Sequence, residues 1–292
     1  MRFAPILAIV FAHESVAQTP TSAAADSRPA LIATIPFARD AGTAIFVPVR
    51  LNGRDAGWWA VDTGASDCII DLAEAKRARL ATRGGREIHG AGKGTVRLDS
   101  IRSAVSLEVA GKKLATCDHF GSIDLSTAGT GNHAIAGILG YEFFHRYIMR
   151  VDFAAHKISL YDPVRFRYTG LGDTVRLEFE GRRQPRVAVR IRTAHRPEVT
   201  RHLIVDTGSE DAVDDSTVRR TMNGPAVTVQ TTGLGSSYEA VIGTLDTVRI
   251  GRSTFTKVAG VASDVGIVGN GIWNRFVCIF DYAHQRVFLE SR

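Results

Sequence analysis

Hydrophobic and polar residues alternate in short runs along most of the chain, and Gly, Pro, Asn or Asp residues separate the runs. Alternation over about four to eight residues is typical of β-strands with one buried face. The pattern predicts strands at residues 31–37, 45–51, 58–61, 106–109 and 113–117, and again at 175–179, 187–191, 203–205, 247–250 and 254–258. Helices are expected at residues 71–80, with Asp71 as N-cap, and near residues 214–222. The chain therefore predicts an all-β fold with few helices.

Glycines mark the turns between these strands. Asn52 and Gly53 form a dipeptide that is typical of a two-residue hairpin turn. Two longer glycine-rich segments, residues 87–96 and 231–238, are each expected to form a hairpin tip between strands. Their glycines are Gly90, Gly92 and Gly94 in the first segment and Gly233 and Gly235 in the second.

Two long segments of the chain align with each other without a gap. Residues 137–160 align with residues 266–289 at a constant offset of 129 (281 − 152). Identical residues in this alignment include Gly137, Gly140, Arg146, Asp152, Ala154 and Leu160, which match Gly266, Gly269, Arg275, Asp281, Ala283 and Leu289. Self-similarity of this length indicates a duplicated structural unit.

The tripeptide Asp-Thr-Gly precedes each repeated segment and follows an apolar run. The copies are Asp62, Thr63 and Gly64, and Asp206, Thr207 and Gly208, at an offset of 144 (206 − 62). One Asp-Thr-Gly is weak evidence because all three residue types are common in turns. Two copies inside a longer repeat are much stronger evidence for a functional pair.

These motifs resemble the aspartic peptidases, specifically the retropepsin-like lobe of retroviral proteases and bacterial aspartyl proteases. The two Asp-Thr-Gly turns and the apolar-apolar-Gly segments at residues 138–140 and 267–269 carry the resemblance, which covers the chain from about residue 31 onward. It implies an all-β fold with two retropepsin-like (acid protease) β-barrel lobes, related by a pseudo-twofold axis and each with a short helix. It also implies that each apolar-apolar-Gly segment packs beside the Asp-Thr-Gly turn of its own lobe.

The resemblance implies that Asp62 and Asp206 are the catalytic residues and that they face each other, as residues do across a twofold contact. Two adjacent carboxylates do not both ionise cheaply, so they share one proton. The charged member takes a proton from a water that attacks the peptide carbonyl, and the protonated member hydrogen-bonds to the carbonyl oxygen. This chemistry needs no cofactor and no metal.

Neighbouring residues support the two turns in this family. The resemblance implies that Thr63 and Thr207 hold the turns together through crossed hydrogen bonds, and that Gly64 and Gly208 donate backbone N–H groups to the carboxylates. The next residue differs between the copies, Ala65 against Ser209. We expect the Ser209 hydroxyl to donate to the Asp206 carboxylate and to favour its ionised form. The glycine-rich hairpins correspond to the flaps that close over substrate in this family; an ordinary glycine-rich turn is the alternative.

The sequence divides into five segments. Residues 1–17 read as a signal peptide, because Arg2 precedes an apolar run that is too short to span a bilayer and a small-residue cleavage site follows. A buried N-terminal strand is the alternative. A disordered leader at residues 18–30, a first lobe at 31–161, a linker at 162–173 and a second lobe at 174–292 complete the division. A signal peptide predicts a periplasmic or secreted protein without stable membrane insertion.

Charge and cysteine content add two expectations. The formal net charge of +6 indicates a solvated surface, and no Gly-rich phosphate loop, aromatic-basic platform or HExxH-like motif points to nucleic acid or metal. Cys68 and Cys117 are candidates for a disulfide, which export permits, and Cys278 is expected to be a buried thiol.

The leading hypothesis is an exported aspartic endopeptidase that acts on polypeptide substrates. The alternative is a non-catalytic periplasmic peptide-binding or scaffold protein that retains the cleft. A glycosidase fits less well, because its two carboxyls stand at least about 5 Å apart, whereas the resemblance implies a closer pair. The sequence carries no signal for an oligomeric state.

Overall fold

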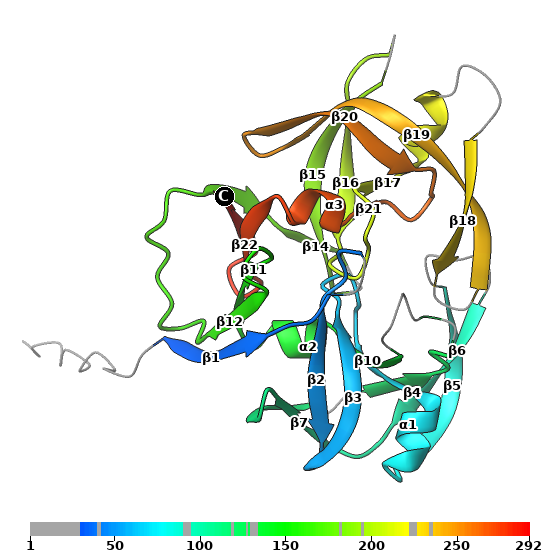
Figure 1. Ribbon diagram of the computed structural model, residues 1–292, viewed down its shortest axis with the longest axis vertical. Coiled ribbons are helices and arrows are strands. Elements are labelled where there is room, and N and C mark those ends of the chain that lie inside the picture. The colour runs from blue at the N-terminus through cyan, green and yellow to red at the C-terminus, as the bar shows by residue number, and fades with distance from the viewer. Residues whose placement is uncertain are drawn as a thin grey trace, which may run out of the picture.

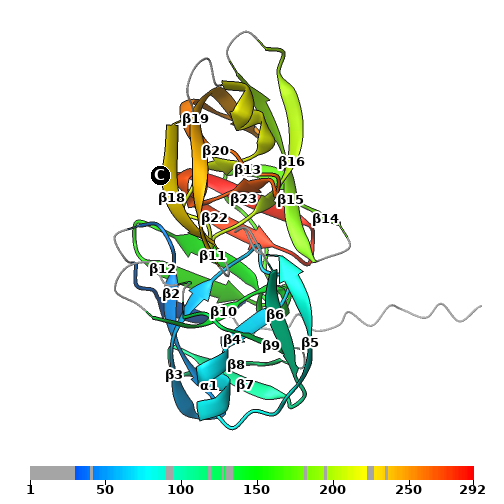
Figure 2. The same ribbon diagram turned by 90° about the vertical axis from the view of Figure 1, so that its right-hand side faces the viewer.

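Three β-sheets make up most of the computed structural model (Figures 1 and 2). It describes residues 30–39, 42–89, 95–117, 120–126, 128, 134–180, 183–193, 196–221, 227–233 and 236–292. Helices in this part of the chain are short, so the prediction of a mostly β fold is confirmed. None of the described helices is long and apolar enough to cross a membrane.

The first half of the chain forms a nine-stranded sheet, at the bottom of Figure 1. Its strands in spatial order are β5 (Thr82–His89), β6 (Thr95–Ile101), β9 (Phe120–Ile123), β4 (Cys68–Asp71), β10 (Ile135–Leu139), β3 (Arg54–Val61), β2 (Phe46–Leu51), β7 (Val105–Val109) and β8 (Lys112–Cys117). β2 and β3 are joined at Asn52 and Gly53, which have φ angles of 48° and 78°. Positive φ at both positions is what a type I′ hairpin turn requires, which confirms the turn prediction.

The second half forms an eight-stranded sheet, at the top of Figure 1. Its strands in spatial order are β14 (Glu178–Glu180), β15 (Gln184–Arg192), β16 (Val199–Val205), β21 (Ile267–Val268), β17 (Val213–Asp214), β20 (Ser253–Val261), β19 (Ser236–Ile250) and β18 (Val227–Gly233). Pairing in the middle of the two sheets is alike. β10 lies parallel to β3 and antiparallel to β4, and β21 lies parallel to β16 and antiparallel to β17.

A six-stranded sheet combines strands from both halves, on the left of Figure 1. Its order is β1 (Leu31–Pro36), β12 (Lys157–Tyr161), β11 (Ile148–Asp152), β22 (Phe276–Asp281), β23 (Arg286–Ser291) and β13 (Asp173–Arg176). The two repeated segments meet at its centre, where β11 pairs with β22. The expected strand at residues 175–179 is instead divided between β13 of this sheet and β14 of the eight-stranded sheet.

The largest group of buried apolar side chains draws on all three sheets. Val49, Val151, Val189 and Phe280 belong to it and represent four different strands from both halves of the chain. The opposite face of the six-stranded sheet is covered by the predicted linker, where Tyr168 stacks on Phe288 at a centroid distance of 3.9 Å. One continuous core therefore ties the halves together.

The helices are shorter than the sequence pattern predicts. α1 (Leu72–Arg77) begins at the expected N-cap, because the Asp71 carboxylate accepts hydrogen bonds from two N–H groups of the first turn. The second expected helix is a 3₁₀ helix, η1 (Ser216–Thr221). Single turns of α-helix, α2 (Tyr141–Phe144) and α3 (Asn270–Trp273), follow β10 and β21 directly. The repeated segments thus have the same element order: strand, helical turn, strand, strand.

Candidate active site

Each Asp-Thr-Gly turn lies at the carboxyl end of a buried strand. β3 ends at Val61 and β16 ends at Val205, so Asp62 and Asp206 are the next residues in the chain. The Asp62 N–H donates to the Leu139 carbonyl at 3.0 Å, and the Asp206 N–H donates to the Val268 carbonyl at 3.1 Å. The parallel strands β10 and β21 therefore fix the backbone of the two acidic residues.

The two carboxylates accept the same set of hydrogen bonds within their own turns. Asp62 Oδ1 accepts from the N–H groups of Gly64 at 2.8 Å and Ala65 at 3.0 Å. Asp206 Oδ1 accepts from the N–H groups of Gly208 at 2.7 Å and Ser209 at 3.1 Å. Each carboxylate is thus oriented by its own backbone and keeps a second oxygen for other contacts.

The glycines show that the turns face each other. A Cβ atom added to Gly64 would lie 2.8 Å from Cγ of Asp206, and one added to Gly208 would lie 2.7 Å from Cγ of Asp62. Such distances are too short for any side chain. Neither glycine has a positive φ, so the requirement here is for close approach to the opposite carboxyl rather than for an unusual backbone angle.

The two threonines join the turns through crossed hydrogen bonds. Thr207 Oγ1 accepts from the Thr63 N–H at 3.1 Å and donates to the Val61 carbonyl at 2.7 Å. Reciprocally, Thr63 Oγ1 accepts from the Thr207 N–H at 3.0 Å and donates to the Val205 carbonyl at 2.7 Å. Both threonines are fully buried. Each hydroxyl therefore satisfies two backbone groups of the opposite half.

Three further polar residues support the turns, and the sequence did not identify them. The Tyr282 hydroxyl donates to the Thr63 carbonyl at 3.0 Å, and Gln184 Nε2 donates to the Gly64 carbonyl at 2.7 Å. Asn270 Nδ2 donates to the Thr207 carbonyl at 2.7 Å. Asn270 is the counterpart of Tyr141 in the first repeat (270 − 129). The replacement of an aromatic residue by an amide between the two copies was the one feature of the sequence that could have indicated its role.

Burial raises the pKa of both acidic residues of the turns. The pKa of Asp62 is raised well above its ordinary value by burial, by the charge of Asp206 and by a hydrogen bond between the two carboxyls. The pKa of Asp206 is also raised by burial, but the hydrogen bond from Asp62 opposes that shift. Two buried carboxyls in contact do not both ionise cheaply, which is the physical reason that both pKa values are raised.

Ser209 does not act as the sequence predicts. The Asp206 carboxylate accepts from the Ser209 backbone N–H, and no hydrogen bond from the hydroxyl is found between these two described residues. The hydroxyl lies on the side of Gly269, since a Cβ atom there would come within 2.9 Å of Ser209 Oγ. Ala65 and Ser209 therefore serve their carboxylates in the same way, through the backbone.

Most of the flap glycines lie outside the described residues, namely Gly90, Gly92, Gly94 and Gly235. The strands beside them are antiparallel pairs, β5 with β6 and β18 with β19. Gly233 is the last residue of β18 and pairs with Ser236.

The predicted cysteine pair is not tested, because the Cys117 side chain also lies outside the described part. Cys68 is buried and its Sγ accepts from the Gly140 N–H at 3.4 Å. Cys278 is a buried thiol, as predicted, and burial raises its pKa.

A second group of carboxyls lies just beyond the second turn. Asp211 is exposed, whereas Asp214 in β17 is 7% exposed. Burial, the charges of Asp211 and Asp206, and a hydrogen bond with Asp211 together raise the pKa of Asp214 to about 8. The sequence pattern placed Asp214 in a helix and gave it no role.

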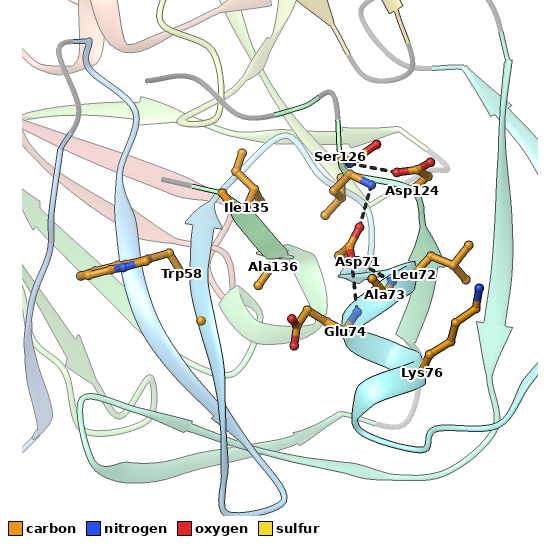
Figure 3. A pocket seen from close by; sticks show the side chains of 13 residues that line it. Trp58, Asp71, Leu72, Ala73, Glu74, Lys76, Asp124, Ser126, Ile135 and Ala136 are labelled. Atoms are coloured by element: carbon orange, nitrogen blue, oxygen red, sulfur yellow. Dashed lines mark hydrogen bonds between the residues drawn. The ribbon is translucent and has the colours of Figure 1, made fainter. Parts of the chain in front are cut away.

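A cavity of about 730 Å³ lies against α1, and no residue of the Asp-Thr-Gly turns is among those that line it. Trp58, Asp71, Lys76 and Ile135 are among its lining residues (Figure 3). Asp71 is engaged there by the N–H groups of α1 and of Leu125. In the described part of the chain, no cluster of three or more His, Cys, Asp or Glu residues is arranged to hold a metal ion.

Comparison with protein families gives a match to the aspartyl protease family over residues 47–143. This segment is about a third of the chain and contains the first Asp-Thr-Gly turn, β10 and most of α2. A search of curated proteins finds none that matches the chain. The family match supports a relationship to aspartic proteases, and thus to enzymes that hydrolyse peptide bonds.

Proposed function

We propose that this chain is an exported aspartic endopeptidase that hydrolyses polypeptides with a water activated between Asp62 and Asp206. One observation carries the proposal: the glycine of each turn lies against the carboxyl of the other, so the two carboxyls share one site. The match to the aspartyl protease family supports it. Export rests on the signal-like pattern of residues 1–17, which lie outside the described part.

The reaction proceeds by acid and base catalysis without a covalent enzyme intermediate. Asp206 is the ionised member and removes a proton from the bound water, whose oxygen attacks the carbonyl carbon of the peptide. Asp62 is the protonated member and passes its proton to the carbonyl oxygen, which gives a tetrahedral diol. When the C–N bond breaks, the amine nitrogen takes the proton held by Asp206, and a hydroxyl proton returns to Asp62.

We also propose that the chain consists of two acid-protease lobes related by a pseudo-twofold axis, residues 31–161 and 174–292. The matched element order of the repeated segments and the matched strand pairing around β10 and β21 support this division. The six-stranded sheet joins the lobes, and the substrate lies over the paired turns. In this arrangement neither half contains a complete active site.

The test is hydrolysis of a mixed peptide library by the wild type, Asp62→Asn and Asp206→Asn. Asn is nearly isosteric with Asp but cannot exchange the proton, so each variant should lose peptide hydrolysis while remaining folded. Asp264→Asn is a matched control, because Asp264 is exposed and pairs with Arg219 on the surface. Near-full turnover by either turn variant would contradict the shared-carboxyl mechanism. A wild type that binds a transition-state mimic such as pepstatin without hydrolysing any peptide would indicate a binding protein instead.

A further inference from the structure

The Asp214 carboxyl is buried without a full set of partners. Only 7% of the residue is exposed, and Oδ1 has no hydrogen-bond partner among the described residues. An unpaired buried carboxyl oxygen is costly, and most buried polar atoms in proteins have a partner. Oδ1 is therefore able to accept a hydrogen bond from a donor that reaches this site.

Strand register places Asp214 on the face of the sheet that carries the catalytic turn. Ile204 pairs with Ile267, which pairs in turn with Asp214. The neighbouring row, Val205, Val268 and Val213, belongs to the main core. Side chains alternate between faces along a strand, so Asp214 points away from that core. Asp206 follows Ile204 by two residues and lies on the same face as Asp214.

No cation among the described residues is paired with the acidic groups around Asp214. The charges of Asp211 and Asp206 raise the pKa of Asp214, and the charge of Glu210 raises the pKa of Asp211. Two other buried carboxylates of the chain are paired with arginine. Asp215 Oδ2 accepts from Arg201 at 3.0 Å, and Asp281 Oδ2 accepts from Arg286 at 2.9 Å. In the described part, the Asp211 and Asp214 pair lacks such a partner, as do the two carboxyls of the proposed active site.

Among the described residues of the first half, no acidic group matches this one. Ile138 is the repeat partner of Ile267 (267 − 129), and it pairs with Ile69 rather than with an acid. Ile69 packs in an apolar group with Leu98, Ile123 and Leu125. The offset of the Asp-Thr-Gly turns makes Asp67 the counterpart of Asp211 (211 − 144) and the buried Ile70 the counterpart of Asp214 (214 − 144). Asp67 has a cationic partner, Arg86, at 3.5 Å. The two sides of the proposed cleft thus differ in chemistry.

We propose that Asp211 and Asp214 form an acidic subsite that receives an arginine or lysine side chain of the polypeptide substrate beside Asp206. The proposal rests on the function proposed above. A guanidinium or ammonium group brings several N–H donors and a positive charge. The donors satisfy the unpaired oxygen, and the charge favours the ionised form of Asp214 despite its raised pKa. The opposite side, lined by Ile69 and its neighbours, receives an apolar side chain.

The test compares cleavage of quenched fluorescent peptides that differ at one residue, either Arg, the isosteric but neutral citrulline, or Leu. This residue is moved through the positions on both sides of the scissile bond. The enzymes are the wild type, Asp214→Ile, which introduces the residue type of the opposite side, and Asp67→Asn as the matched control. Asp214→Asn serves as a second variant that keeps the shape of the side chain.

At one position the wild type and Asp67→Asn should prefer Arg over citrulline by about 10- to 100-fold in kcat/KM, the effect of a hydrogen bond to a buried charged group. Asp214→Ile and Asp214→Asn should lose this preference, and Asp214→Ile should gain activity on the Leu peptide. A wild type that cleaves Arg and citrulline peptides equally, or a preference that survives both Asp214 variants, would overturn the proposal.

Calorimetry with non-hydrolysable statine peptides separates this proposal from the proposed function. If the wild type cleaves no peptide but binds the Arg statine peptide more tightly than the citrulline one, and Asp214→Ile removes the difference, the subsite stands and the enzymatic function fails. Equal binding of the two peptides would refute the subsite, whatever the chain hydrolyses.

Discussion

Replacing Thr207 with valine tests whether the crossed hydrogen bonds hold the two halves of the site together. Valine has nearly the shape of threonine, so the change removes the hydroxyl and leaves little or no cavity. The hydroxyl oxygen accepts from the Thr63 N–H and donates to the Val61 carbonyl, at 3.1 and 2.7 Å. Both backbone groups belong to the opposite half of the chain, and both threonine side chains are fully buried.

The expected loss follows from these two unpaired groups. A buried donor or acceptor left without a partner costs about 1–3 kcal/mol, so the variant should lose roughly 2–6 kcal/mol in its free energy of unfolding. This is a large share of the roughly 5–15 kcal/mol that stabilises an ordinary domain. Thr63→Val should cost a similar amount, because Thr63 makes the reciprocal pair of hydrogen bonds.

Urea unfolding followed by tryptophan fluorescence measures the loss, and the chain offers a close control. Thr217 is also buried, at 2% exposure, but its hydroxyl has no hydrogen-bond partner among the described residues. Thr217→Val should therefore be neutral or slightly stabilising. Thr207→Ser keeps the hydroxyl and should recover most of the stability lost in Thr207→Val.

A Thr207→Val variant whose unfolding free energy stays within about 1 kcal/mol of that of Thr217→Val would refute the reasoning, since one buried unpaired group alone costs at least that much. The same conclusion would follow if Thr207→Ser were as unstable as Thr207→Val. In either case the threonines would contribute packing rather than hydrogen bonds that hold the turns together.

Two further predictions concern pH. Ala65→Ser should leave both limbs of the pH–rate profile in place, because the corresponding Ser209 donates to Asp206 through its backbone N–H. A decrease of about 0.5 pH units or more in the apparent pKa of the alkaline limb would contradict this, since a new hydrogen bond of roughly 1 kcal/mol has an effect of that size. Asp214 has a pKa raised from 3.8 to about 8 in the folded chain, so its contribution to stability is present at low pH and is lost as the pH rises from about 4 to 8. Asp214→Asn should reduce the fall in unfolding free energy over this range, and an unchanged slope would refute the assignment.

Features set by short stretches of sequence were predictable. The hairpin turn at Asn52 and Gly53 and the N-cap at Asp71 depend on neighbouring residues, and both formed as expected. The duplicated segments gave the same element order, because β10 and β21 carry the same apolar pattern before their glycines. The position of Asp62 and Asp206 at strand ends followed from the same local signal.

Features that depend on distant partners were not predictable. Alternating apolar residues show that a strand buries one face, but they do not say which strand will pair with it. β1 forms where a strand was predicted and pairs with β12, but the sheet that holds them also contains β22 and β23 of the second half, which the local pattern does not indicate. Tyr282 and Gln184 reach the first turn from the second half for the same reason.

The threonines and glycines that are identical in the two turns all contact the opposite half of the chain. Thr63 satisfies the backbone of the second half and Thr207 that of the first, so a change in either copy would damage the other. The same holds for Gly64 and Gly208, because a side chain on either glycine would collide with the carboxyl of the opposite turn. Ile69 and Asp214 instead contact their own halves, and nothing across the site requires them to match. Residues that bring the carboxyls together are therefore constrained as a pair, whereas residues beside them are free to differ. In the function that we propose, this freedom lets the two sides of the substrate cleft differ in chemistry.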